Sequence, residues 1–216
     1  MNHFLNRLLF YPLMLNPVKL FARINELDWY KNTLRTWVDD LNLITNAKAL
    51  ELGCATGVLT EYMASRGYEA TGIDASDQMI KAALSSEGHR GHYLTSDAKS
   101  LKFADSSFDA VISASLLNII SEPEKMLQEI SRVSKPGGLV SILVPKQGFD
   151  DVQHAELIKA TNLAGFSAGA LSIWNKRAPK LDPKTAGEWF MRAGIINIRE
   201  KEYLGGMVST VTGTMP

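Results

Sequence analysis

Cysteine is almost absent from this chain, with Cys54 the only one among 216 residues. A single cysteine excludes an internal disulfide and a zinc site built from several thiolates, so we expect a reducing, cytoplasmic setting and no metal. An excess of charge is also lacking, because 23 acidic residues balance 23 basic ones. A nucleic-acid partner is therefore disfavoured, since phosphate binding needs a basic surface.

Long hydrophobic runs are lacking too. The nearest approach lies near the start of the chain, where Asn6, Arg7 and Pro12 interrupt an apolar stretch. It is too short to supply the about 20 residues that span a bilayer, and it lacks the basic start and small-residue cleavage site of a signal peptide. Three interpretations stay open: a packed helix or lid, a weak membrane-surface contact, and an oligomer contact. The apolar side chains concerned are Phe4, Leu5, Leu8, Leu9, Phe10, Tyr11, Leu13, Met14 and Leu15.

From about residue 47 onward, short apolar runs alternate with helical patterns. This alternation is typical of βαβ units and a mainly parallel sheet. Two further β-rich runs meet at Gly205 and Gly206, and so short a join predicts a hairpin, hence one antiparallel strand in an otherwise parallel sheet. We expect one structural domain, with residues 1–46 as a helical cap or lid and residues 47–216 as the main part. The predicted strands are 47–52, 69–74, 92–96, 108–113, 139–144, 195–203 and 207–214.

Helix signals lie between these strands. Ser76 is a suitable N-cap for a helix with apolar residues at helical spacing. Ser121 with Glu124 three positions later predicts a capping box, and the sequence from Lys135 to Gly138 predicts the end of that helix. Later helices are predicted over 151–164 and 184–193, and the glycine-containing stretch between them carries no predicted element.

A glycine-rich turn from Glu51 to Gly57 follows the first strand, where open α/β sheets bind nucleotides. A dinucleotide fingerprint would begin at Gly53, but its later glycines fall on Ala55 and Val58, so the close backbone approach to a pyrophosphate is lost. Glu51 would repel a diphosphate and attract a cation. A pair of unit charges about 4 Å apart interacts with roughly 4 kcal/mol at an effective dielectric constant near 20, before desolvation. A ligand with an ammonium and a sulfonium fits this turn better.

Further acids end the next two predicted strands. Asp74 can accept hydrogen bonds from both ribose hydroxyls, and Asp97 can accept one from an adenine amino group while the amide of Ala98 donates to the ring. Any one strand-end acid is ordinarily just solvated. Together with Glu51 and the glycine turn, these acids predict a nucleoside site.

In this order and spacing, several sequence blocks resemble the class I S-adenosylmethionine-dependent methyltransferases. Within them the similarity is to the small-molecule group that includes the ubiquinone and menaquinone methyltransferases. The resemblance implies an α/β, Rossmann-like fold, with a seven-stranded, mostly parallel sheet, a C-terminal antiparallel hairpin strand and helices on both faces. The matching blocks are 49–57, 72–76 with Met79, 96–98, 108–111 and 129–138.

The resemblance also implies the cofactor, S-adenosylmethionine, and roles around it. Glu51 and Gly53 would lie near its methionine part, Asp74 on the ribose, and Ser113 at the start of the loop that faces the sulfonium. A second glycine is common where this chain has Ala55. Asn118 lies where relatives often carry histidine and the quinone methyltransferases an asparagine. The full set of predicted cofactor-binding residues is Glu51, Gly53, Cys54, Ala55, Gly57, Asp74, Ala75, Met79, Asp97, Ala98 and Ser113.

The predicted reaction is methyl transfer to a small molecule, with an apolar or quinone-like acceptor as the finer expectation. Displacement from a sulfonium needs few reactive side chains, because proximity and orientation can supply about 7 to 11 kcal/mol, and no catalytic residue is assigned. His154 is more readily interpreted as partly exposed than as a base, and Trp29, Tyr30 and Trp174 as packing residues rather than a pocket lining. The alternatives are a non-catalytic S-adenosylmethionine-binding regulator and, least favoured, an NAD-dependent dehydrogenase.

Overall fold

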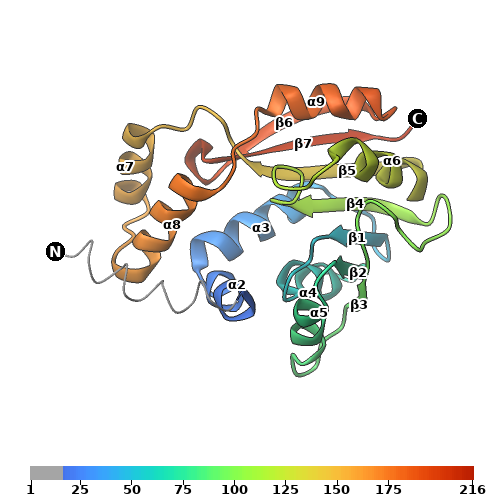
Figure 1. The fold of residues 1–216 in the computed structure, drawn as a ribbon, viewed down its shortest axis with the longest axis horizontal. Helices are drawn as coiled ribbons and strands as arrows, with labels where there is room; N and C mark the ends of the chain where they lie inside the picture. Colours follow the sequence, from blue (N-terminus) through green and yellow to red (C-terminus); the bar gives the residue numbers. More distant parts are fainter. Residues whose placement is uncertain (1–16) are drawn as a thin grey trace.

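A computed structural model describes residues 17–216, and its centre is a seven-stranded sheet in the order β3-β2-β1-β4-β5-β7-β6 (Figure 1). Strands β1 to β5 pair in parallel, whereas β7 runs antiparallel to both β5 and β6. The predicted single reversed strand is confirmed. The strands are β1 Lys48–Leu52, β2 Glu69–Asp74, β3 His92–Thr95, β4 Phe108–Ala114, β5 Ser134–Pro145, β6 Ile196–Tyr203 and β7 Val208–Thr214.

Helices cover both faces of this sheet, as predicted. Successive strand residues point to opposite faces, so Ala49 packs in a cluster with α3 and α4, and Leu50 packs in a second cluster with α6 and α9. In both clusters the buried residues of each helix recur at helical spacing. The helices are α2 Pro17–Asn25, α3 Asp28–Asp40, α4 Val58–Ser65, α5 Asp77–Leu84, α6 Pro123–Val133, α7 Asp151–Ala160, α8 Gly165–Arg177 and α9 Pro183–Arg192.

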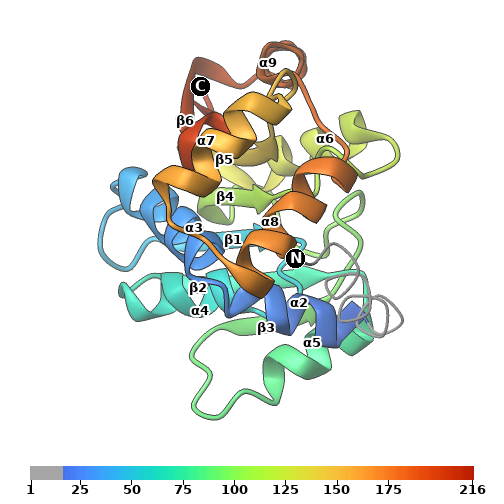
Figure 2. The same ribbon diagram turned by 90° about the vertical axis from the view of Figure 1, so that its left-hand side faces the viewer.

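Three helices, α2, α7 and α8, gather at the end of the molecule toward which β4 and β5 point (Figures 1 and 2). The arrowheads of both strands face this end in Figure 1, and Figure 2 looks directly onto it. Parallel strands end at a common edge, and ligands of open α/β sheets bind beyond that edge. The fold therefore places a helical covering over the edge where the glycine turn lies.

Two predicted boundaries around α6 are wrong. The helix has no capping box, because its N-cap is Glu122 in a left-handed conformation and Pro123 supplies the first helical position. Ser121 instead accepts a hydrogen bond from the Lys99 ammonium at 3.3 Å. Strand β5 begins at Ser134, earlier than the predicted residue 139, because Ser134 already pairs with Phe108 of β4, before a register shift to the pair Ala110 and Leu139.

Helix α8 was not predicted. Its segment contains Gly165 and Gly169, which lower helix propensity, and its apolar and polar residues do not separate onto two faces. Helix α7 is also shorter than predicted, ending at Ala160. Both departures fall outside the parallel βαβ part, where the alternation was most regular.

The apolar start of the chain up to residue 16 lies outside the described residues, so its three interpretations stay predictions, as does the division at residue 46. Helix α3, which falls within the predicted cap, packs against the sheet. Trp37 is fully buried and its indole N–H donates to the Ser141 hydroxyl in β5 at 2.9 Å. Across residues 17–216 no helix combines the length and apolar character needed to cross a membrane.

Candidate cofactor and active site

The turn after β1 is built from left-handed residues. Gly53, Ala55 and Gly57 have φ values of 76°, 47° and 86°, and the amides of Gly53 and Cys54 both donate to the Ile73 carbonyl of β2. A residue with a Cβ loses about 1–2 kcal/mol in this conformation, which is the physical reason that glycine suits position 55. The turn keeps its shape with alanine there, at the expense of local strain.

Asp74 ties this turn to the next helix. Its carboxylate accepts hydrogen bonds from the Ala55 amide at 3.0 Å and from the Ser76 amide at 2.9 Å. The Ser76 hydroxyl in turn caps α5, as predicted, by accepting from the Met79 amide. A carboxylate offers about four lone-pair sites, so Asp74 keeps acceptor capacity for a ligand.

A cavity of about 270 Å³ opens beside Asp74. Its polar groups sit at strand ends, and Leu116 and Ile120 from the segment after β4 close it with an apolar wall. The Ser96 hydroxyl is buried there without a hydrogen-bond partner among the residues that the structure describes. The cavity is lined by Gly53, Ile73, Asp74, Ala75, Ser96, Asp97, Ala98, Lys99, Leu116 and Ile120.

The sequence prediction and this lining overlap in Gly53, Asp74, Ala75, Asp97 and Ala98. The remaining lining residues were not among the predicted ones. All five are apolar or adjacent to a predicted residue. Ile73 and Ser96 lie within the matching blocks 72–76 and 96–98, and for the other three the only signal was position, after Ala98 or after the fourth strand. The wall from the segment after β4 comes together with the strand tips only in the folded chain.

The other predicted residues do not line the cavity. Cys54 is buried against Tyr93, and burial raises the pKa of its thiol, which therefore stays protonated. A Cβ at Gly57 would approach the Tyr93 hydroxyl oxygen to 2.5 Å, so this position has no room for a side chain. Met79 is buried in α5, and the Ser113 hydroxyl donates to the Leu52 carbonyl at 2.9 Å.

Glu51 is the most perturbed acid of the site. Its side chain is 3% exposed and accepts a hydrogen bond from the Thr60 hydroxyl. The pKa of Glu51 is raised to about 7, mainly by burial and in smaller part by the negative charge of Asp74, while the Thr60 hydrogen bond opposes the shift. Burial, and the charge of Glu51, raise the pKa of the nearby Tyr30 hydroxyl of α3. Within residues 17–216 Glu51 has no cationic partner, so a positively charged ligand would favour its ionised form.

The covering helices contact the loops of the site directly. The Asn25 amide of α2 donates to the Thr56 hydroxyl in the glycine turn at 2.7 Å. On the other side, the Asn118 amide donates to the Pro179 carbonyl just after α8 at 2.8 Å. In the described part of the chain the Oδ1 atoms of Asn118 and Asn175 are buried without a hydrogen-bond partner.

Aromatic side chains join α3 to α8. Trp29 stacks on Trp174 with ring centroids 5.6 Å apart, and Tyr30 meets Trp174 edge to face. The rings pack against each other, in agreement with their interpretation as packing residues.

His154 of α7 is half-buried, and its Nε2 lies 3.2 Å from the Ser172 hydroxyl of α8. Burial lowers the pKa of His154.

A sheet with a reversed seventh strand, a left-handed turn after β1 and acids at the tips of β1, β2 and β3 define the class I methyltransferase arrangement. A family model described as a methyltransferase domain matches residues 50–142. The chain is 35% identical over 188 residues to a demethylmenaquinone methyltransferase of Renibacterium salmoninarum, across 81% of this chain and 77% of the relative. It is 31% identical over 186 residues to a ubiquinone biosynthesis O-methyltransferase of Paracidovorax citrulli, across 71% and 76%.

The fold has solved counterparts. An S-adenosylmethionine-dependent methyltransferase from Aquifex aeolicus is similar with a TM-score of 0.69 at 18% identity, covering 93% of this chain and 97% of that one. This chain belongs to the S-adenosylmethionine-dependent methyltransferases of small-molecule type. It is an enzyme that uses S-adenosylmethionine, and the alternative of a non-catalytic regulator is not favoured by these similarities.

Proposed function

We propose that this enzyme methylates an apolar, quinone-like small molecule that binds under α2, α3 and α8. Relatives named for demethylmenaquinone and ubiquinone biosynthesis support this acceptor class. The observation that carries the proposal is the Oδ1 of Asn118 in the loop after β4, which is buried and has no hydrogen-bond partner among residues 17–216. A buried acceptor atom without a partner costs about 1–3 kcal/mol, and a ring hydroxyl of the acceptor would remove that cost.

We also propose how the chain holds its cofactor. Asp74 with Ala75 binds the ribose hydroxyls, and Asp97 with Ala98 binds the adenine. Glu51 attracts the ammonium of the methionine part. The residues present fit this ligand, because the cavity combines strand-end carboxylates with an apolar wall and with the Ser96 hydroxyl, which no other described residue binds. The other proposed contributors shape the turn, back the adenine or support the sulfonium loop: Gly53, Cys54, Ala55, Gly57, Met79 and Ser113.

In this mechanism the side chains act mainly by orientation. The bound cofactor supplies an activated methyl group on a sulfonium. Asn118 accepts a hydrogen bond from the acceptor and so orients the ring. Correct placement of two reactants can lower a barrier by about 7 to 11 kcal/mol. The proton that the acceptor loses on methylation passes to solvent, and no side chain is assigned as its base.

The experiment is a turnover assay with S-adenosylmethionine and a panel of acceptors, with S-adenosylhomocysteine formation as the readout. The panel contains a short-chain naphthohydroquinone, a substituted benzenediol and several polar amines. We expect turnover on the ring hydroxyl compounds, and a reduction of about tenfold in Asn118→Ala with unchanged cofactor affinity. Turnover on the amines alone, or full activity of Asn118→Ala on the hydroquinone, would contradict the proposal.

A further inference from the structure

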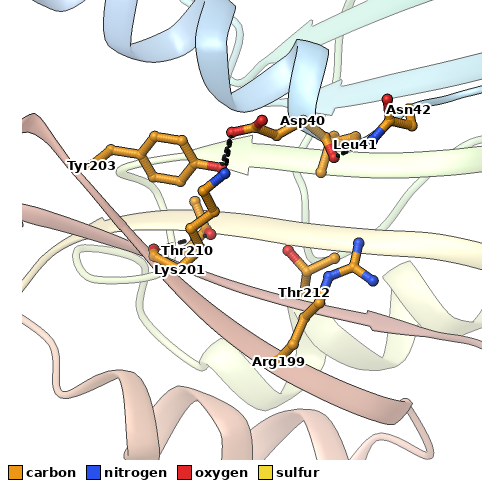
Figure 3. A pocket seen from close by; sticks show the side chains of 8 residues that line it. All are labelled: Asp40, Leu41, Asn42, Arg199, Lys201, Tyr203, Thr210 and Thr212. Carbon is orange, nitrogen blue, oxygen red and sulfur yellow. Dashed lines mark hydrogen bonds and ion pairs between the residues drawn. The ribbon is translucent and has the colours of Figure 1, made fainter.

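A second cavity, of about 380 Å³, lies between the C-terminal end of α3 and strands β6 and β7 (Figure 3). It shares no lining residue with the cofactor cavity. Its walls are polar or charged almost throughout. They are formed by Asp40, Leu41, Asn42, Arg199, Lys201, Tyr203, Thr210 and Thr212.

Strand β6 turns its cations toward this cavity. Successive side chains of a strand alternate between faces, so Arg199 and Lys201 share the cavity face, whereas Glu202 belongs to the opposite face. Across the β6–β7 pair, Arg199 stands opposite Thr212 and Lys201 opposite Thr210. Each cation therefore lies beside a hydroxyl group.

The charges of the cavity do not balance. Asp40 binds the Lys201 ammonium at 2.7 Å and accepts from the Tyr203 hydroxyl at 2.8 Å. Arg199 forms no ion pair with any residue between 17 and 216. With one carboxylate against two cations, the cavity keeps one positive charge, and it is carried by Arg199 next to Thr212 (Figure 3).

A buried chain of donors ends at the same place. The Trp37 indole N–H donates to the Ser141 hydroxyl at 2.9 Å, and the Ser141 hydroxyl lies 2.6 Å from that of Thr212. Since Ser141 already accepts from Trp37, it can donate its own proton to Thr212. The Thr212 hydroxyl proton is then available to an acceptor in the cavity, beside the Arg199 guanidinium.

We propose that this cavity binds a small phosphomonoester, with its phosphate between Arg199 and Thr212. A guanidinium matches the geometry of a phosphate with two parallel hydrogen bonds, and a hydroxyl donor adds a third. The cavity is larger than one phosphate group and falls within the about 300–1,000 Å³ of small-molecule sites, which leaves room for the organic part. The ligand joins the C-terminal end of α3 to β6 and β7.

The experiment titrates the full chain with glycerol 3-phosphate by calorimetry at fixed ionic strength. We expect saturable binding to one site, no binding of glycerol, and affinity weakened at least about tenfold in Arg199→Gln, the change expected from losing a charge-assisted pair worth about 1.4 kcal/mol or more. The matched control is Arg192→Gln, because Arg192 is exposed on α9 at the opposite face of the sheet. That control should bind glycerol 3-phosphate like the wild type, and all variants should bind S-adenosylmethionine equally.

Two further variants keep the test decisive. Arg199→Lys preserves the charge but not the paired geometry and should also bind more weakly, and Thr212→Val should lose the hydroxyl contribution at nearly constant volume. Absence of saturable binding would overturn the proposal. Equal affinity of Arg199→Gln and wild type for glycerol 3-phosphate would overturn it too. So would an equal calorimetric signal when sodium chloride is titrated in place of glycerol 3-phosphate.

Discussion

Replacing Glu51 by glutamine should strengthen the fold and weaken cofactor binding at the same time. The reason is that the Glu51 carboxyl is 3% exposed and has its pKa raised from 4.5 to about 7, mainly by burial. Folding therefore favours the protonated form. Glutamine retains an oxygen that can accept from the Thr60 hydroxyl, but it never acquires the buried charge.

The sign of the stability effect follows from the raised pKa. The contribution of Glu51 to stability is fully present below pH 4.5 and is lost as the pH rises through about 7. At about 1.4 kcal/mol for each unit of pKa shift, the loss amounts to roughly 3 kcal/mol. At pH 8 the free energy of unfolding of Glu51→Gln should therefore exceed that of the wild type by up to about 3 kcal/mol, which would appear as a higher denaturant midpoint. At pH 4 the two free energies should be nearly equal.

Cofactor affinity should change in the opposite direction. If Glu51 attracts the ammonium of S-adenosylmethionine, the Glu51 carboxyl has to be ionised in the complex. Because its pKa is about 7, the ionised fraction, and with it the affinity for the cofactor, should fall about tenfold between pH 8 and pH 6. Calorimetric titration at these pH values checks this, with Glu51→Gln expected to bind more weakly at pH 8 and to lose the pH dependence.

If Glu51 had only a structural role, Glu51→Gln would not raise the free energy of unfolding and weaken cofactor binding at the same time. The control Glu69→Gln, at an exposed position at the start of β2, should change neither quantity. The reasoning is refuted if Glu51→Gln is no more stable than wild type at pH 8, or if it binds the cofactor with unchanged affinity and the same pH dependence.

Three other changes have expected outcomes. Asp74→Ala removes the acceptor of two backbone amides and of the proposed hydrogen bonds to the ribose. Because each hydrogen bond to a charged group is worth about 1.5–3 kcal/mol, S-adenosylmethionine should bind at least about 100-fold more weakly in calorimetry. Unchanged affinity would count against the ribose role. Ala55→Gly relieves a left-handed alanine with φ of 47° and should raise the unfolding free energy by about 1 kcal/mol, whereas a loss of stability in denaturant titration would contradict the strain. Phe190→Ala empties a fully buried position on α9 and should lower the unfolding free energy by about 3–5 kcal/mol; a change below about 1 kcal/mol in the same titration would be incompatible with its place in the core.

Much of the sheet was predictable because its signals are local. Strand β2 has the predicted bounds Glu69–Asp74, because the left-handed Gly67 just before it and the acid Asp74 at its end are local signals. The join at Gly205 and Gly206 correctly predicted the reversed strand, because so few residues can only turn the chain back. The N-cap Ser76 was predictable for the same reason.

Other elements depended on contacts that no local pattern contains. Helix α8 has no separate apolar face, and it is stabilised by its packing against α3 through Trp174. Strand β5 begins at Ser134 because Phe108 pairs with it across the sheet. Leu116 and Ile120 became part of the cofactor cavity only when the segment after β4 folded over the tips of β1 and β2.

The amino-acid sequence by itself determined the order of strands and helices along the chain, the glycine turn, and the acids that end the first three strands. Only the tertiary structure decided what those groups experience. The pKa of Glu51 shifts because distant segments remove water from it, and Arg199 remains unpaired within the described residues because Asp40, from a helix far away in sequence, is occupied by Lys201. The free energy of a charge depends on the solvent and partners around it, and those are set by residues that meet only in the folded chain.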